Sequence, residues 1–235
     1  TVDQRDISAI IISLAVKGKL KIKSVEGFLR RDVELVLTTG ADETNLDGIE
    51  TKLFRYLQKS GTVITEADLR EDVAPHMGEM RKLVYDTLVT KGFYRSSPEG
   101  VRTAWIIGGL FTMLCLGAGV TAMSPFKNPL PGIVGGVIGF IIVAIYSKGM
   151  PRRTPAGAKT LGKVRGFEEF IRRAKEKELD YMSKKEPDMA LFESYLPHAV
   201  AFGLAKHWSS AFDGILKEMP DWYISPHRHF IAMDF

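Results

Sequence analysis

The chain has 235 residues, a net charge of +4, 45% hydrophobic residues and a mean hydropathy close to zero. A single cysteine excludes a disulfide framework, and the lack of paired cysteines excludes the usual structural zinc sites. The near-zero hydropathy averages two very apolar runs with polar flanks, which predicts three parts: residues 1–102, 103–147 and 148–235. Because the sequence begins on Thr1 rather than methionine, we expect it to be part of a longer protein.

The first part, residues 1–102, predicts helices interleaved with a small β-hairpin. Apolar residues at helical spacing between Ile7 and Leu14 indicate a helix that stops at Gly18. Residues 20–23 and 33–37 are typical of two strands, with a turn over 24–27.

Three further helices are expected before residue 93. The first carries its apolar face between Ile49 and Leu57 and ends at Gly61. Thr65 and Asp68 form a capping-box pattern for the next. Pro75 then separates that short helix from a last one, which is closed by Gly92.

This order of elements predicts a winged-helix-like cytosolic segment. Many winged helices bind DNA, and a DNA reader concentrates Lys and Arg on one exposed helix and its hairpin. The densest basic group here alternates along one strand face instead: Lys17, Lys19, Lys21 and Lys23. We therefore expect nucleic acid to be an unlikely partner and keep a membrane-tethered nucleic-acid-binding regulator as an alternative.

Residues 103–147 predict a transmembrane helical hairpin. The runs 104–123 and 130–147 carry no charge, and each approaches the roughly 20 residues that a helix needs to cross a bilayer core. The alternative is a buried helical hairpin in a soluble domain. Against it, the second run holds four glycines that each cost roughly 1 kcal/mol in a soluble helix but allow close helix packing in lipid. These predicted span-packing residues are Gly132, Gly135, Gly136 and Gly139.

The charges beside the spans predict their orientation. Six basic residues follow the second span, with no acidic residue between Lys148 and Gly166, whereas the connecting loop offers only Lys127. The positive-inside rule then places both ends in the cytoplasm of a multi-pass cell-membrane protein. We expect the six to form a cluster that faces anionic lipid headgroups: Lys148, Arg152, Arg153, Lys159, Lys163 and Arg165.

Residues 148–235 predict a helical cytosolic segment. Pro151 and Pro155 disfavour a helix around them, and an amphipathic pattern begins near Thr160. That helix either lies on the lipid surface or packs against the rest of the segment. We expect a break at Pro197, a helix over 198–212 and an aromatic turn after it. Because each flank is small for a core of its own, residues 148–235 are expected to be able to pack with 1–102.

Four stretches carry a resemblance to a known family: DISAIIISLAVKGKLKIK, MPRRTPAGAKTLGKVRGFEEFI, LFESYLPHAVAFGLAKHW and PDWYI. In this order, with the apolar hairpin between the first two, they resemble the cytoplasmic part of the YciQ-like predicted bacterial membrane proteins, a family of unknown function. The resemblance implies an extracytoplasmic β-rich domain and a further span upstream. It implies no established activity, so no catalytic residue is assigned.

No P-loop, GxSxG or HExxH motif is present in the sequence, and we expect neither an enzyme nor a bound cofactor. His227 and His229 form an HxH pattern that is weak grounds for a metal site. The favoured function is a membrane-anchored interaction or assembly protein, with a protein partner or a homo-oligomer and an anionic bilayer as partners. A component of an oligomeric transporter or channel remains a further alternative. Against it, two spans without intramembrane charge form no ion pathway unless the protein oligomerises.

Overall fold

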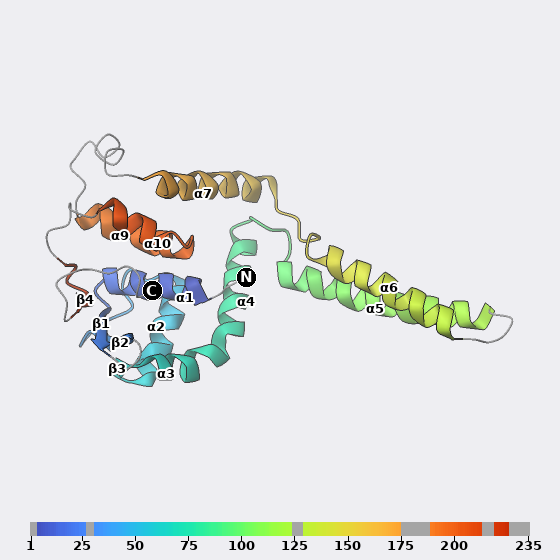
Figure 1. The fold of residues 1–235 in the computed structure, drawn as a ribbon, viewed down its shortest axis with the longest axis horizontal. Helices are drawn as coiled ribbons and strands as arrows, with labels where there is room; N and C mark the ends of the chain where they lie inside the picture. Colours follow the sequence, from blue (N-terminus) through green and yellow to red (C-terminus); the bar gives the residue numbers. More distant parts are fainter. Residues whose placement is uncertain (1–3, 27–30, 124–128, 175–188, 213–218, 226–235) are drawn as a thin grey trace. The chain divides into compact units, whose positions relative to one another are not determined.

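The computed structural model describes residues 4–26, 31–123, 129–174, 189–212 and 219–225. The fold is mainly helical, with a small mixed sheet of four strands (Figure 1). It divides into two compact units, one of residues 1–84 with 163–235 and one of residues 85–162. We call them the two-flank unit and the hairpin unit; the predicted boundaries at residues 102 and 148 stay predictions.

The two-flank unit begins with helix α1 (Gln4–Val16), followed by strands β1 (Leu20–Glu26) and β2 (Arg31–Leu37). Gly18, two residues beyond the end of α1, takes φ +72°, as expected of a helix stop. The strands pair antiparallel, with Leu20 opposite Leu37. The predicted turn over 24–27 is wrong in its first part, because Ser24 continues β1 opposite Val33 and the strand runs two residues further.

The next elements are α2 (Gly48–Ser60), β3 (Val63–Ile64), α3 (Glu66–Asp68), η1 (Leu69–Val73), η2 (Ala74–His76) and α4 (Met77–Thr90). Helices α2 and α3 each begin with a capping box. Asp47 and Glu50 form one on α2, and Thr65 with Asp68 forms the predicted one on α3. Each box satisfies backbone N–H groups that the first helical turn leaves without partners.

The C-terminal elements are α7 (Pro155–Arg173), α9 (Met189–Ala201), α10 (Ala205–Ala211) and β4 (Tyr223–Ile224). Pro155 starts α7 instead of delaying it, since proline suits the first position of a helix. The predicted break at Pro197 is wrong: this proline lies inside α9. The chain turns at Gly203, which has φ +72°. The backbone N–H of Gly203 donates to the carbonyl of Val200, and that of Leu204 donates to the carbonyl of Ala199, which closes α9.

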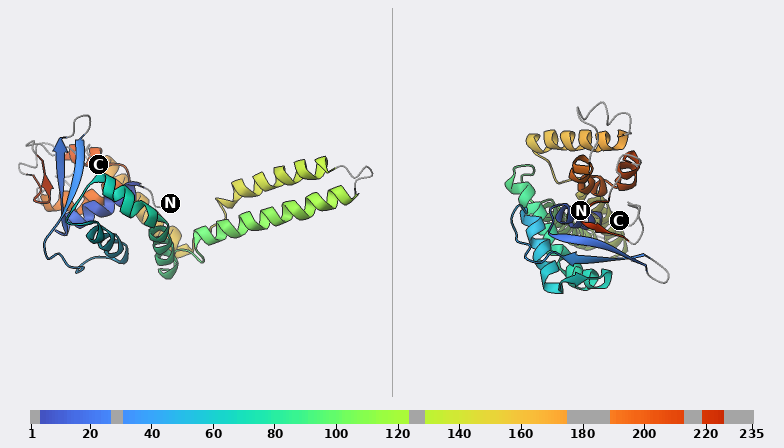
Figure 2. Two further views of the ribbon diagram at one scale, coloured as in Figure 1. Left: turned by 90° about the horizontal axis from the view of Figure 1, so that it is seen from below. Right: turned by 90° about the vertical axis from the view of Figure 1, so that its left-hand side faces the viewer.

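The core of the two-flank unit joins the beginning and the end of the chain. The sheet has the order β3-β2-β1-β4, and β4 pairs in parallel with β1, placing Ile22 opposite Tyr223 (Figure 2). Helix α1 packs against α9 and α2. Side chains with no exposed surface come from both flanks, among them Ile12, Leu14, Leu53, Phe54, Phe192 and Trp208.

The winged-helix prediction is not confirmed. The helix just ahead of the hairpin, which in such a fold enters the DNA groove, is α1. Beyond Arg5 it has no exposed residue, and α9 and α2 pack against it. The sheet also takes its fourth strand, β4, from the far end of the chain. What stands is the coarser prediction of a mainly α fold with a small β-hairpin.

The hairpin unit contains two candidate membrane helices, α5 (Pro98–Met123) and α6 (Leu130–Ser147), which lie side by side (Figures 1 and 2). Only 6% of the most apolar window of α5 and 17% of that of α6 is buried. A hairpin in the core of a soluble domain would be mostly buried, so that alternative is wrong. These helices present apolar side chains outward, as membrane spans do.

Candidate functional site

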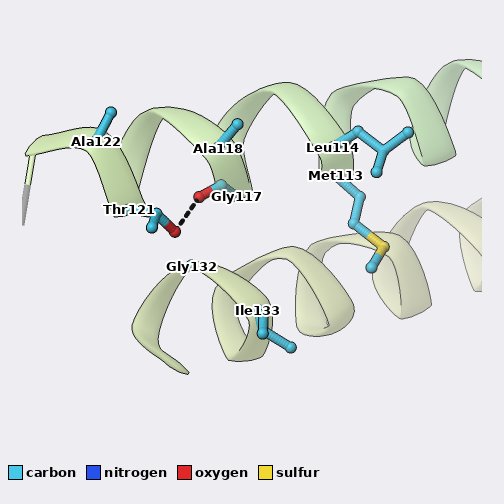
Figure 3. Close-up of a pocket in the computed structure, with 8 residues that line it drawn as sticks. All are labelled: Met113, Leu114, Gly117, Ala118, Thr121, Ala122, Gly132 and Ile133. Atoms are coloured by element: carbon cyan, nitrogen blue, oxygen red, sulfur yellow. Dashed lines mark hydrogen bonds between the residues drawn. The ribbon is translucent and has the colours of Figure 1, made fainter. Parts of the chain in front are cut away.

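The two spans approach each other through glycines. A Cβ atom placed on Gly132 would lie 2.5 Å from the carbonyl oxygen of Gly117, and one on Gly136 would lie 3.0 Å from Cγ of Met113. Figure 3 shows Thr121 pointing from α5 toward Gly132, and Met113 pointing toward α6 further along the two helices. These two glycines therefore let the helix backbones approach closely, as small residues do in membranes.

The other two predicted span-packing glycines point elsewhere. A Cβ atom on Gly135 or Gly139 would meet nothing within 4 Å. Sequence reasoning missed the matching residue Gly109 on α5, whose added Cβ would lie 2.7 Å from Cγ1 of Val143. Its signal was available, because Gly109 and Gly117 stand on one helical face.

A groove of about 720 Å³ runs beside this contact, lined by Met113, Leu114, Gly117, Ala118, Thr121, Ala122, Gly132 and Ile133 (Figure 3). Its one hydroxyl, on Thr121, donates to the carbonyl oxygen of Gly117 at 2.8 Å within the same helix. The groove therefore offers no free polar side chain for orienting a ligand, and its apolar lining suits hydrocarbon.

The segments that flank the spans are tied together by what we call the juxtamembrane clasp, residues 92–94 with 153–157. Tyr94 and Arg153 form an isolated antiparallel bridge. Nε of Arg153 donates to the Tyr94 hydroxyl at 3.0 Å, and its Cζ lies 5.9 Å from the centre of the tyrosine ring. Thr154 donates through Oγ1 to the carbonyl of Gly92 at 2.6 Å and through its backbone N–H to Phe93 at 3.0 Å.

The clasp also fixes the start of α7. Oγ1 of Thr154 accepts a bond from the backbone N–H of Gly157 at 3.0 Å, as a helix cap does. A Cβ atom on Gly157 would lie 2.2 Å from the carbonyl oxygen of Phe93, so only glycine fits there. Sequence reasoning missed this arrangement because its two halves are some 60 residues apart. The local signal that could have indicated the helix start is a threonine directly before a proline, at Thr154 and Pro155.

The six residues of the predicted lipid-facing cluster all have exposed side chains. Arg153 is held in the clasp, and Lys148, Arg152 and Lys159 belong to the same unit. Lys163 and Arg165 lie on α7 within the two-flank unit, so the structure does not bring all six into one described site. Within the described ranges, none of the six forms an ion pair.

Basic residues of the two-flank unit are arranged differently. Lys17, Lys19 and Lys23 pair with Glu50, Asp42 and Glu34 at 2.6, 2.7 and 3.0 Å. Residues 85–162 hold eight Lys and Arg against two acidic residues, whereas the rest of the chain holds 24 against 26. The positive charge of the protein therefore belongs to the hairpin unit.

Glu50 is the main buried charge of the two-flank unit, with 6% of its surface exposed. Burial by itself would raise the pKa of its carboxyl. Bonds from Lys17 and from Oγ of Ser13, together with the backbone N–H of Asp47, outweigh burial and hold the pKa below the usual 4.5. This ionised carboxylate ties α1 to the first turn of α2, so its role is structural.

The described ranges contain no group of three or more His, Cys, Asp or Glu side chains arranged to hold a metal ion. His198 packs edge-on against Phe167 at 5.4 Å, and burial lowers its pKa below 6.5. His227 and His229 lie outside the described residues.

Comparisons with known proteins identify the family. No curated protein and no solved structure matches the chain significantly. A family model described as "Predicted membrane protein (DUF2207) C-terminal domain" matches residues 1–212, which confirms the predicted membrane protein family of unknown function. With its two candidate membrane helices and a family match along nearly its whole length, the chain belongs to the DUF2207 predicted membrane proteins and carries their C-terminal domain.

Proposed function

We propose that this protein is a membrane-anchored interaction or assembly protein whose two-flank unit is held at the inner leaflet by the α5–α6 hairpin. The observation that carries the proposal is that one folded unit is built from both sides of an outward-facing apolar hairpin. Strand β4 pairs with β1, and α9 packs on α1. A bilayer between the flanks would prevent these contacts, which supports placing both on one side.

Charge supports the cytoplasmic side. The cations of the hairpin unit that flank the spans have no carboxylate partner among the described residues, so they are available to a negatively charged leaflet. Lys19 and Lys23, which a nucleic-acid reader would use, are already paired within the chain. This difference favours a lipid surface over nucleic acid as the anionic partner.

An interaction role is supported by a groove of about 630 Å³ in the two-flank unit. It is lined by Val25, Val33, Glu34, Thr65, Glu66, Ala67, Arg70 and Glu71. Strand β3 pairs with only Leu35 and Val36 of β2. On that edge, the part of β2 before Leu35 has no strand partner in the described chain. An extended peptide recognises such an edge through its backbone and the adjoining groove through its side chains.

Photocrosslinking in native membranes tests the proposal. A photoreactive amino acid replaces Ala67, in the groove, and in a matched variant replaces Lys82, an exposed residue of α4. We expect one discrete crosslinked partner from position 67 and none from position 82. Recovery of uncrosslinked protein from both positions would contradict the interaction role. Substrate turnover that is abolished by one polar substitution would replace it with an enzymatic one.

A further inference from the structure

We propose that the juxtamembrane clasp is a phosphate-binding site in which Arg153, oriented by Tyr94, binds the headgroup phosphate of an anionic phospholipid. The inference rests on the proposed function, because it requires the hairpin to lie in a membrane. It goes further than the lipid-facing cluster, which is only a charged surface, because it assigns the phosphate group of the ligand to one residue pair.

The first argument is the fixed orientation of the guanidinium group. The bridge between Tyr94 and Arg153 holds the main chain, and the bond from Nε to the tyrosine hydroxyl holds the side chain. No other side-chain hydrogen bond and no ion pair of Arg153 is found among the described residues, which leaves both Nη groups for a ligand. Two parallel N–H donors on one planar group match two oxygens of a phosphate.

The second argument is the charge around the clasp. Lys148 and Arg152 are exposed nearby in the sequence, again without ion pairs in the described ranges. The first turn of α7, which starts two residues after Arg153, carries no acidic residue. Eight basic residues against two acidic ones in residues 85–162 therefore favour an anionic ligand over a cationic or neutral one.

The third argument is position along the chain. Arg153 follows Ser147, the last residue of α6, by six residues, and Tyr94 precedes Ala104, where the uncharged run of α5 begins, by ten. Headgroup phosphates lie outside the apolar part of a spanning helix, and tyrosine is favoured in that region. A lipid phosphate is therefore the source that we expect, and free phosphate is the other source of the same chemistry.

The test uses the full chain in lipid nanodiscs of phosphatidylcholine, to which phosphatidylglycerol or inorganic phosphate is added. Native mass spectrometry measures how strongly each is retained. Tyr94→Phe removes the hydroxyl without changing charge, and Arg153→Gln removes the guanidinium. The matched control for the hydroxyl is Tyr146→Phe, at the exposed end of α6. Arg152→Gln removes an equal charge one residue away and measures the general attraction of the basic surface.

We expect retention of phosphatidylglycerol to fall about tenfold in Arg153→Gln and several-fold in Tyr94→Phe, with less than about a twofold change in Tyr146→Phe. Arg152→Gln, which loses one charge of the same basic surface, should lose clearly less retention than Arg153→Gln. Retention of inorganic phosphate instead of lipid, lost in the same two variants, would support the phosphate site with free phosphate as its source. Equal losses in Arg152→Gln and Arg153→Gln, with none in Tyr94→Phe, would overturn the proposal in favour of diffuse attraction. Wild-type protein that retains neither ligand would also overturn it.

Two controls separate this outcome from that of the proposed function. Insertion into the nanodisc and the crosslink from Ala67 report on the anchor and the interaction role, and neither involves Arg153. Circular dichroism checks that each variant is folded. Should Arg153→Gln fail to fold, Tyr94→Phe decides alone, because it retains the ring and the charge of the clasp.

Discussion

Gly132 and Gly135 stand three residues apart on α6 but have opposite surroundings. An added methyl group meets the Gly117 carbonyl at 2.5 Å in the first case and nothing within 4 Å in the second. We expect Gly132→Ala to destabilise the hairpin by about 1 to 3 kcal/mol, because backbone atoms must move apart, and Gly135→Ala to change it by less than about 0.5 kcal/mol. Titration with a denaturing detergent, followed by a dye on Cys115, measures both; equal losses would contradict the observed helix contact.

Glu50 gives the two-flank unit a dependence on pH. Its pKa is lower in the folded chain than in the unfolded one, so its contribution is complete above the unfolded pKa of about 4.5 and is lost as pH falls through the folded pKa. We expect Glu50→Gln to cost about 1 to 3 kcal/mol at pH 7 and to flatten the loss of stability below pH 4.5. Denaturation of the full chain, followed by tryptophan fluorescence, measures both effects.

The control for Glu50 is Glu43. Its pKa is also held below 4.5, by a bond from Arg55, but both side chains of this pair are exposed. Glu43→Gln should therefore cost much less stability than Glu50→Gln, because solvent screens an exposed ion pair. A loss as large as that of Glu50→Gln would show that burial is not what gives the Glu50 contact its strength.

At the scale of elements, α9 departs most from what its local sequence predicts, because it contains a proline in its interior. Pro197 lacks the N–H that a helix interior uses, yet α9 continues past it because Phe192 and Leu196 on one side and Ala199 and Val200 on the other all lie in the core. Burial of these four side chains outweighs the cost of the proline. The helix ends at Ala201, and the chain turns at Gly203, which has a positive φ.

These two positions make a paired prediction. Gly203→Ala should destabilise the protein by about 1 kcal/mol or more, because φ +72° strains a residue with a Cβ atom and the Arg5 side chain lies 3.0 Å from where that atom would be. Pro197→Ala should not destabilise it, since it restores a helical N–H donor. Thermal unfolding of the two variants tests this, and the reverse order would contradict the observed end of α9.

Elements could be predicted from the sequence where the interactions that form them lie within a few residues along the chain. The spans, α1 and the Thr65–Asp68 cap followed from spacing within one helix. Strand β4 did not, because Tyr223 pairs with Ile22 some 200 residues away and its two-residue length leaves no alternating pattern. The clasp was hidden for the same reason, since nothing near Tyr94 in the sequence points to Arg153.

At the scale of the whole molecule, contacts join the two ends of the chain into one folded unit. The two-flank unit interleaves the two ends of the chain, and the hairpin leaves it after residue 84 and returns at residue 163. Charge follows the same division, with the basic excess in residues 85–162. The central claim is therefore that one folded unit, closed from both flanks, is anchored by a hairpin that enters and leaves the membrane on one side.

Cysteine accessibility tests that claim most directly. Cys115, inside α5, is replaced by serine, and single cysteines are placed at Lys59 in α2, at Lys206 in α10 and at Lys127 between the spans. An impermeant maleimide should label positions 59 and 206 only in inside-out membrane vesicles, and position 127 only in intact cells. Labelling of 59 and 206 from opposite sides of the membrane would contradict the account, because β1 and β4 could not then belong to one sheet.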